Sequence, residues 1–317
     1  MTIEQLLSIY FWKGEMKMKY TNPVYRPPFE ADSLLLQVTV GCSHNQCSFC
    51  TMYQDVPFRT ESMEQIEKDL VEARKTYSKV NRIFLVNADP FVLSANKLKL
   101  IATKINEILP EVETIAMYAS IKNIINKTDE ELKELRALKI NELNIGVESA
   151  MQEVVEHFNK GFTIEEAKEQ LNRLTNAGID FSLNIIIGAA GSEKSYDNAI
   201  ANSKFLNEIK PYLIFIATLH IDEGSPLEEE LKKGIFKENT LRQNVEEEIL
   251  MLSGLDLNGT YFYGRHVSNI IPVYGMLPEK KEEMLTTLKK GLSSIKAEYL
   301  DDHLKKGSEG NIISILR

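Results

Sequence analysis

Outside one short segment, this chain of 317 residues contains no cysteine. Its three cysteines, Cys42, Cys47 and Cys50, lie within a span of nine positions. An odd number in so tight a cluster argues against a disulfide framework. Structural zinc usually takes four ligands, and neither a Cys-x-x-Cys nor a His-x-x-x-His pair follows nearby. The cysteines therefore form one local site, and no thiolate remains for a second one.

Long apolar runs and long basic runs are also missing. No apolar segment approaches the ~20 residues that a membrane span needs. The segment Leu6–Trp12 is short and lacks the basic residues of a signal peptide. The formal net charge of −9 disfavours nucleic acid as the main partner. With 43% hydrophobic and 26% charged residues, the sequence predicts a soluble globular protein of the reducing cytoplasm, without a membrane span.

The cysteines lie on a loop, Gly41–Tyr53, that directly follows an apolar run of strand length, Ser33–Val40. Three thiolates on one loop can converge on one metal centre, and their softness favours an iron–sulfur cluster. A cubane cluster held by three thiolates leaves one iron free to bind another molecule. A zinc loop and a set of redox-sensing thiols are the alternatives, and either would make the chain a non-catalytic sensor.

Phe49 precedes the last cysteine, and together these residues resemble the signature of the radical S-adenosylmethionine (radical SAM) superfamily, Cys-x-x-x-Cys-x-x-Cys. Here four residues, not three, separate Cys42 from Cys47. The resemblance implies that Cys42, Cys47 and Cys50 hold a [4Fe-4S] cluster whose free iron binds S-adenosylmethionine. In that family, one electron from the cluster cleaves S-adenosylmethionine to methionine and a 5′-deoxyadenosyl radical, which abstracts a hydrogen atom.

Strand and helix signals alternate along most of the chain. This alternation predicts an α/β fold of parallel βα units with the helices outside. The resemblance implies a partial (β/α)6 TIM-like barrel. We expect strands at residues 33–40, 80–86, 113–119, 141–148, 181–187 and 212–220. We expect helices that begin at the capping residues Ser62, Ser94, Thr128 and Thr163.

Three regions follow from this pattern. Residues 1–32 form an N-terminal extension, residues 33–224 the barrel, and residues 225–317 a cap that faces the substrate. Prolines keep the end of the extension out of a helix, so we expect it to close the bottom of the barrel as a strap. The cap is predicted to be mostly helical, with an irregular segment at Leu255–Leu277.

A parallel barrel places its site at the carboxyl ends of the strands. Glu148 ends the fourth strand, and a buried charge predicts a polar ligand beside it. The stretch Ile145–Ser149 resembles the ribose motif of the family, so Glu148 and Asn184 are expected to bind ribose. Ile187 and Gly188 resemble its adenine-packing motif. The alternatives are a carboxylate at a helix amino terminus and a glycine needed for tight strand-to-helix packing.

Three further positions complete the expected S-adenosylmethionine site. The family commonly carries Gly-Gly-Glu after the second strand, whereas this chain has Asn87-Ala88-Asp89. Asp89 is expected to bind the methionine amine, Ser120 the methionine carboxylate, and Phe49 to lie near adenine. The alternatives are an ordinary turn residue at Asp89 and a core-lining hydroxyl at Ser120.

Aromatic and polar groups gather at Tyr261–Asn269, within the irregular part of the tail. Loops over a rigid scaffold often carry binding residues, so we expect a substrate-facing lid here, with Tyr263, Arg265 and His266 as catalytic residues. Arg265 is suited to clamp a carboxylate or phosphate. A loop that only packs the cap onto the barrel is the alternative. Glu223–Leu227 resembles the branch of oxygen-independent coproporphyrinogen oxidase without establishing that substrate.

The lack of further cysteines argues against an auxiliary cluster, a methyl-carrying cysteine and a cysteinyl radical. No cobalamin-binding domain is expected before the barrel. The prediction is an anaerobic radical SAM enzyme, an oxidoreductase or a transferase. It would abstract hydrogen from a small or medium-sized substrate and receive its electron from a flavodoxin or ferredoxin. A radical SAM methyl or adenosyl transferase without cobalamin is the alternative.

Overall fold

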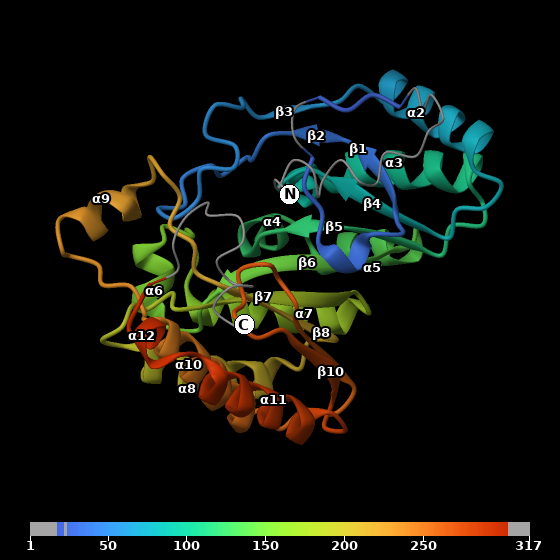
Figure 1. Ribbon diagram of the computed structural model, residues 1–317. Coiled ribbons are helices and arrows are strands. Elements are labelled where there is room, and N and C mark those ends of the chain that lie inside the picture. The colour runs from blue at the N-terminus through green and yellow to red at the C-terminus, as the bar shows by residue number, and fades with distance from the viewer. Residues whose placement is uncertain (1–17, 22–23, 304–317) are drawn as a thin grey trace.

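An eight-stranded, mostly parallel sheet organises the protein. The structure is a computed structural model that describes residues 18–21 and 24–303. The strands follow the spatial order β1-β4-β5-β6-β7-β8-β9-β10 (Figure 1). The first six are β1 (Leu34–Gln37), β4 (Arg82–Val86), β5 (Thr114–Ala119), β6 (Ile140–Glu148), β7 (Asp180–Ile187) and β8 (Leu213–Thr218). Neighbours among these six pair in parallel, which confirms the predicted α/β partial barrel.

Helices connect these strands and cover one face of the sheet (Figure 1). The longer ones are α2 (Met63–Thr76), α3 (Ala95–Ile108), α5 (Asp129–Ala137), α7 (Ile164–Ala177) and α8 (Ser195–Ile209). The short ones are η1 (Pro28–Glu30), η2 (Pro90–Val92), α4 (Ile121–Ile125) and α6 (Gln152–His157). Within the described residues, no helix is long and apolar enough to cross a membrane.

The predicted helix starts are confirmed. Ser62, Ser94, Thr128 and Thr163 each precede a helix, and each side chain accepts a hydrogen bond from the amide three residues further on. These bonds satisfy amides that the first turn of a helix leaves without an intrahelical partner. The helix after Thr163 ends at Gly178, whose φ of 72° suits a glycine at this position.

The predicted first strand is in fact two strands. After β1, the chain leaves the barrel as β2 (Thr39–Val40) and pairs antiparallel with β3 (Arg59–Thr60). The residues between β2 and β3 contain all three cysteines. This small ladder therefore holds both ends of the cysteine loop together.

The expectation of an irregular segment at 255–277 is wrong, because two strands form there. β9 (Thr260–Gly264) pairs in parallel with β8, and β10 (Val273–Leu277) pairs antiparallel with β9. The rest of the tail is mostly helical, as predicted, and forms α9 (Pro226–Lys232), α10 (Leu241–Gly254), α11 (Lys281–Ser294) and α12 (Ala297–Leu300). The boundary after residue 224 stays a prediction, and the strands beyond it extend the sheet of the barrel.

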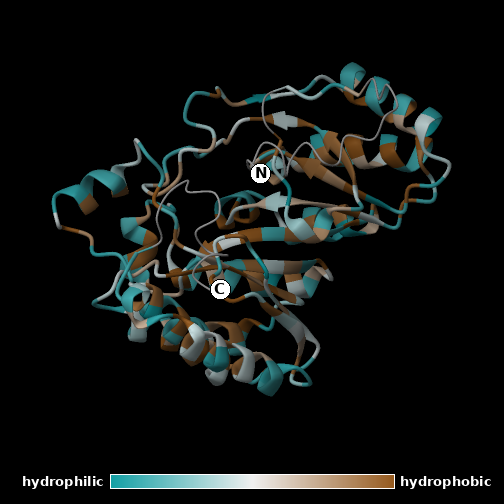
Figure 2. Ribbon diagram, viewed as in Figure 1, coloured by the Kyte–Doolittle hydropathy of each residue, from teal (hydrophilic) through white to brown (hydrophobic). Residues whose placement is uncertain are grey.

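Alternate residues of each strand face the helices and the lumen of the barrel, as the period of two requires. On β6, Leu143, Ile145 and Val147 are fully buried in the main hydrophobic core with residues of the helices. Asn144 and Gly146 face the opposite side. Figure 2 shows the strands as mostly hydrophobic and the outer helix surfaces as mostly hydrophilic. The core thus lies between sheet and helices, and polar groups are free to line the lumen.

The end of the N-terminal extension crosses the amino ends of the strands, as predicted. Glu30 is fully buried and binds the guanidinium of Arg82, the first residue of β4, with Nε at 2.8 Å from Oε2. The same guanidinium binds Glu142 on β6, with Nη1 at 2.7 Å from Oε1. Tyr212 adds a hydroxyl bond of 3.0 Å to Glu142. The strap is thereby fixed to β4 and β6 through one shared arginine.

Replacing Arg82 with methionine is expected to lower the free energy of unfolding by about 3 kcal/mol, because Glu30 would stay buried without its cation. Urea denaturation would measure the loss. Lys99→Met is the control, since its ion pair with Glu134 at 2.7 Å is partly exposed and should contribute less than about 1 kcal/mol. Equal losses in the two variants would contradict the account of the strap.

Candidate active site at the carboxyl ends of the strands

The three cysteines are free thiols on one half-buried loop. Burial raises the pKa of Cys42 and of Cys47, and it raises the pKa of Cys50 to about 11. Metal-free thiols at these positions hold their protons at neutral pH, so binding a metal centre must release them. The described residues contain no group of three or more Cys, His, Asp or Glu side chains spaced to hold a single ion. A cubane cluster offers a separate iron to each thiolate, so its ligands stand further apart.

Hydrogen bonds fix the cysteine loop to the segment that follows β6. The hydroxyl of Ser48 donates to the carbonyl of His157 at 2.8 Å, and the side-chain amide of Asn159 donates to the carbonyl of Gln46 at 2.9 Å. The ring Nε2 of His44 lies 2.6 Å from the carbonyl oxygen of Asn159. The loop is thus positioned from the end of β6 as well as by its own ladder.

A second set of bonds fixes the loop to the segment after β8. The amide and hydroxyl of Thr51 donate to Asp222 at 3.1 and 3.0 Å. The amide of Leu227 donates to the carbonyl of Ser48 at 2.9 Å. Because both anchoring segments lie beyond the carboxyl ends of their strands, the cysteines stand at the end of the barrel where parallel-barrel sites form.

Asp89 holds the loop from a third direction. Its carboxylate is 5% exposed and accepts the amide of Ser43 at 3.1 Å and also the Ser43 hydroxyl. Burial raises the pKa of Asp89. Binding of the methionine amine by Asp89 stays a prediction, and in this structure the carboxylate ties the cysteine loop to the end of β4.

Glu148 and Lys160 form a nearly buried ion pair beside the loop. Lys160 Nζ lies 2.8 Å from Glu148 Oε1 and 5.9 Å from the centroid of the Phe49 ring. A Cβ on Gly146 would lie 2.2 Å from Glu148 Oε1, so only glycine leaves room for this carboxylate. Burial alone would lower the pKa of Lys160, but the charge of Glu148 outweighs it and raises that pKa. A fixed ammonium therefore faces the cysteine loop at neutral pH.

The sequence by itself assigns Lys160 no role. A lysine that follows a short helix is an unremarkable sequence feature. Lys160 matters because it contacts the carboxylate of Glu148, which lies twelve positions earlier in the chain. No local pattern predicts that contact.

The structure separates the other expected cofactor residues. Ser120 caps α4, accepting the amide of Asn123 at 3.3 Å, so it stands at the end of β5. Asn184 is half-exposed on the lumen side of β7, opposite Gly146 of β6. The side chain of Ile187 is fully buried in the core on the helix side. The side chain of Ile187 therefore faces away from the lumen. Contact of adenine with the main chain of Ile187 stays a prediction.

One carboxylate from the tail organises the loop after β7. Glu247 of α10 is 2% exposed and accepts four hydrogen bonds. The donors are the amide of Gly188 (3.1 Å), the hydroxyl of Ser195 (2.6 Å) and the side-chain amides of Asn198 (2.7 Å) and Asn239 (2.8 Å). Gly188 has a φ of 83°, which glycine adopts without strain. The position of this loop thus depends on a residue 59 positions further along the chain.

The same network reaches the segment after β6. Asn198 receives the hydroxyl of Ser149 at 2.6 Å, and Asn202 receives the amide of Ala150 at 2.7 Å. Ser149 directly follows Glu148 in the sequence. Glu247 therefore links the two segments that carry the predicted ribose and adenine contacts, and sequence reasoning missed it because it lies in the tail.

The three predicted catalytic residues of the lid lie in two different places. Tyr263 stacks on Phe215 of β8 with 5.7 Å between ring centroids, and His266 lies 5.6 Å from the same ring. Arg265 is exposed, and its guanidinium lies 4.7 Å from the centroid of the Tyr274 ring on β10. Tyr263 and His266 thus meet on one side of the sheet, whereas Arg265 stands at its edge.

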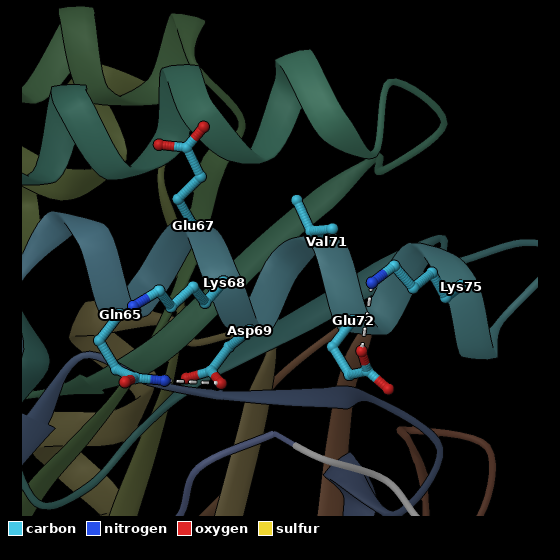
Figure 3. A pocket seen from close by; sticks show the side chains of 7 residues that line it. All are labelled: Gln65, Glu67, Lys68, Asp69, Val71, Glu72 and Lys75. Atoms are coloured by element: carbon cyan, nitrogen blue, oxygen red, sulfur yellow. Dashed lines mark hydrogen bonds and ion pairs between the residues drawn. The ribbon is translucent and has the colours of Figure 1, made fainter.

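A shallow pocket along α2 is not part of this site (Figure 3). Its side chains pair along the helix, as in Lys75 with Glu72 at 3.7 Å and Gln65 with Asp69 at 3.1 Å. Such pairs are typical of a solvated helix face and not of a ligand site. The pocket is lined by Gln65, Glu67, Lys68, Asp69, Val71, Glu72 and Lys75.

A parallel partial barrel with three free cysteines on a loop beyond its strands defines a class of cluster-binding proteins. The family model described as the radical SAM superfamily matches residues 36–198, slightly more than half of the chain. The chain belongs to the radical SAM superfamily. Its cofactors are accordingly a [4Fe-4S] cluster and S-adenosylmethionine, and the cysteine loop supplies the chemistry that fits the cluster.

Two curated proteins illustrate the range of relatives. The chain is 26% identical over 110 residues to the tRNA uridine(34) acetyltransferase of Methanocaldococcus jannaschii, covering 34% of this chain and 20% of that protein. It is 19% identical over 227 residues to the heme chaperone HemW of Bacillus subtilis, covering 70% and 59%. The chain thus spans less than two thirds of the length of either relative.

Solved structures share the fold. Methylornithine synthase (PylB) aligns with a TM-score of 0.52 at 17% identity, over 71% of this chain and 64% of that chain. The archaeal Elp3 of Methanocaldococcus infernus aligns with a TM-score of 0.52 at 15% identity, over 82% and 63%. At these identities the likeness establishes the fold of the barrel and not a substrate.

Replacing Glu247 with glutamine is expected to lower the free energy of unfolding by about 3 kcal/mol, because an amide nitrogen would face donors that now bond a carboxylate. Chemical denaturation of the anaerobic protein would measure this. Glu248→Gln is the matched control on the same helix. Glu248 is 4% exposed, and its Oε1 has no hydrogen-bond partner among the described residues.

Burial raises the pKa of Glu248 from 4.5 to about 8. The folded chain then keeps a proton that the unfolded chain releases, so Glu248 costs stability increasingly as the pH rises from 4.5 to about 8. Glu248→Gln should therefore change stability little at acidic pH and stabilise the protein at alkaline pH. Equal effects of the two glutamine variants at neutral pH would contradict the role given to Glu247.

Proposed function

We propose that this chain cleaves S-adenosylmethionine reductively and uses the resulting 5′-deoxyadenosyl radical to abstract hydrogen from a small or medium-sized substrate. The observation that supports this most is the cysteine loop, because three thiols outside any disulfide are fixed at the carboxyl ends of the strands from three directions. The cluster, when bound, supplies the electron that breaks the carbon–sulfur bond. The residues of the chain bind, orient and shield the reacting molecules.

Under this proposal Cys42, Cys47 and Cys50 hold the cluster. Lys160 neutralises charge beside it and keeps Glu148 in place for the ribose hydroxyls. The residues proposed to bind S-adenosylmethionine are Phe49, Asp89, Ser120, Glu148, Asn184, Ile187 and Gly188. Tyr263, Arg265 and His266 are proposed to contact the substrate.

The proposed cleavage of S-adenosylmethionine also needs an external electron donor. Ser43, Asn45 and Gln46 are exposed on the cysteine loop, which leaves this loop accessible to a redox partner. A flavodoxin or ferredoxin is the class of partner that fits. A methyl or adenosyl transfer without cobalamin would use the same site and is distinguished by its products.

Anaerobic reconstitution with iron and sulfide, followed by dithionite and S-adenosylmethionine, is expected to yield 5′-deoxyadenosine. Cys50→Ala should reduce the product to the level without enzyme, because one cluster ligand is lost. Chromatography with mass detection would quantify 5′-deoxyadenosine and S-adenosylhomocysteine together. S-adenosylhomocysteine alone would indicate methyl transfer, and zinc in the purified protein with neither product would indicate the sensor.

Replacing Lys160 with methionine is expected to weaken S-adenosylmethionine binding about tenfold or more, because Glu148 loses its buried partner and no longer holds its position. Anaerobic titration followed by the spin-resonance signal of the cluster would measure the affinity. Lys194→Met is the matched control, since the Lys194–Glu153 pair is about half-exposed. Unchanged affinity in Lys160→Met, with full iron content, would remove Lys160 from the site.

A further inference from the structure

A row of aromatic rings lines the barrel where β8 meets β9. Phe215 and Tyr263 are direct partners in the parallel ladder, and their rings stack with an interplanar angle of 18°. Phe29 of the strap meets both rings edge-on, with centroids 5.9 Å from Phe215 and 5.7 Å from Tyr263. We call Phe215, Tyr263 and His266 the aromatic wall. The strap, β8 and β9 are distant in the sequence, and each contributes a ring to this cluster.

The aromatic wall is accessible, unlike the core. On β8, Ile214 and Ile216 are fully buried against the helices, whereas Phe215 and Ala217 between them are half-exposed. Phe215 therefore keeps part of its surface open on the lumen side. Aromatic surface left open on the lumen side of the sheet is a candidate binding surface, because closing it against a ligand is favourable.

The ladder row that carries the aromatic wall contains no charged side chain of its own, although the paired Glu148 and Lys160 lie against its Gly146 end. The ladder places Gly146, Asn184, Phe215 and Tyr263 side by side across four strands. The row beneath contains Tyr118, Asn144 and Ser182, again without a charged group. A ligand group stacked against Phe215 and Tyr263 therefore meets rings and an amide, and the cation nearest to this row, Lys160, is already paired with Glu148.

The row beneath also has an unsatisfied donor. Ser182 donates its hydroxyl to Asn144 Oδ1 at 2.5 Å, while the buried Asn144 Nδ2 has no partner among the described residues. Asn144 is 1% exposed. A buried amide without a partner is costly, and it favours a ligand that brings an acceptor.

His266 offers a second donor. Ser268 donates its hydroxyl to His266 Nδ1 at 2.7 Å, and its oxygen in turn accepts the amide of Thr218 at 2.9 Å. Burial lowers the pKa of His266, which favours the neutral ring. Because Nδ1 accepts the amide of Ser268 at 3.3 Å, the proton of the neutral ring is assigned to Nε2. Nε2 has no hydrogen-bond partner in the part of the chain that the structure describes.

We propose that the aromatic wall binds an uncharged heteroaromatic ring of the substrate, stacked against Phe215 and Tyr263 and held by His266 Nε2 through an acceptor atom in the ring or attached to it. The proposal rests on the proposed function in taking the lumen as the substrate chamber. It also revises the expectation of an anionic substrate group, because Arg265 lies on Tyr274 at the edge of the sheet and not in the row.

The test uses 2-pyridone and its saturated counterpart 2-piperidone, which share the amide and differ in aromaticity. Saturation-transfer NMR on the anaerobic holoprotein should show 2-pyridone binding about fivefold more tightly than 2-piperidone, as one aromatic contact predicts. Benzoate, which is aromatic and charged, should not compete. Equal binding of the two amides, or competition by benzoate, would overturn the proposal.

Variants locate the subsite. Phe215→Leu and His266→Leu should each weaken 2-pyridone binding about fivefold, whereas Tyr196→Leu, on an exposed ring of α8, should leave it unchanged. Circular dichroism and iron content identify any variant that fails to fold. In that case the comparison of 2-pyridone with 2-piperidone on the wild-type protein decides whether the proposal holds. Unchanged binding in a folded Phe215→Leu would reject the aromatic wall. Failure to form 5′-deoxyadenosine would reject the proposed function while leaving the probe results intact.

Discussion

The active end of the barrel depends on the buried carboxylate of Glu247. A charge removed from water is tolerated only when hydrogen bonds replace its hydration, and here four donors do so. Those donors come from the loop after β7, from α8 and from the segment before α10. Satisfying one charge therefore fixes the loop at Gly188 and, through Asn198, the chain beyond Glu148. The tail is an internal support of the site and not a detachable cover.

A second constraint balances charge around the cysteines. Lys160 is held between Glu148 and the Phe49 ring, while Asp89 binds Ser43 on the opposite side of the loop. Each charged group thus restrains a backbone segment and also sets the local field. Because the cysteine loop is bonded to the ends of β4, β6 and β8, its geometry is set by the barrel as a whole. The aromatic wall stands two to three strands away from the Glu148–Lys160 ion pair in the same ladder row, whose own side chains are uncharged.

The parts that the sequence predicted well carry local signals. Capping side chains at Ser62, Ser94, Thr128 and Thr163 act within one helical turn, and strand composition and turn residues are equally short-range. The cysteine loop is visible because three rare residues stand together. The prediction is wrong at β9 and β10, because the segment expected to be irregular, Leu255–Leu277, contains the alternating aromatic residues of Thr260–Gly264, which form a strand. That error arose because the tail lacks the regular strand–helix spacing that made the first six units readable.

The sequence by itself determined the ligand chemistry and the order of the elements, since thiol softness, capping and alternation are properties of neighbouring residues. The tertiary structure decided which distant groups meet. Lys160 reaches Glu148, Glu247 reaches Gly188, and Phe215 lies beside Tyr263 through strand register and helix packing. The interaction energy of a buried charge or an exposed ring depends on the groups that surround it in space. Those surroundings exist only after the strands have aligned and the tail has packed against the sheet.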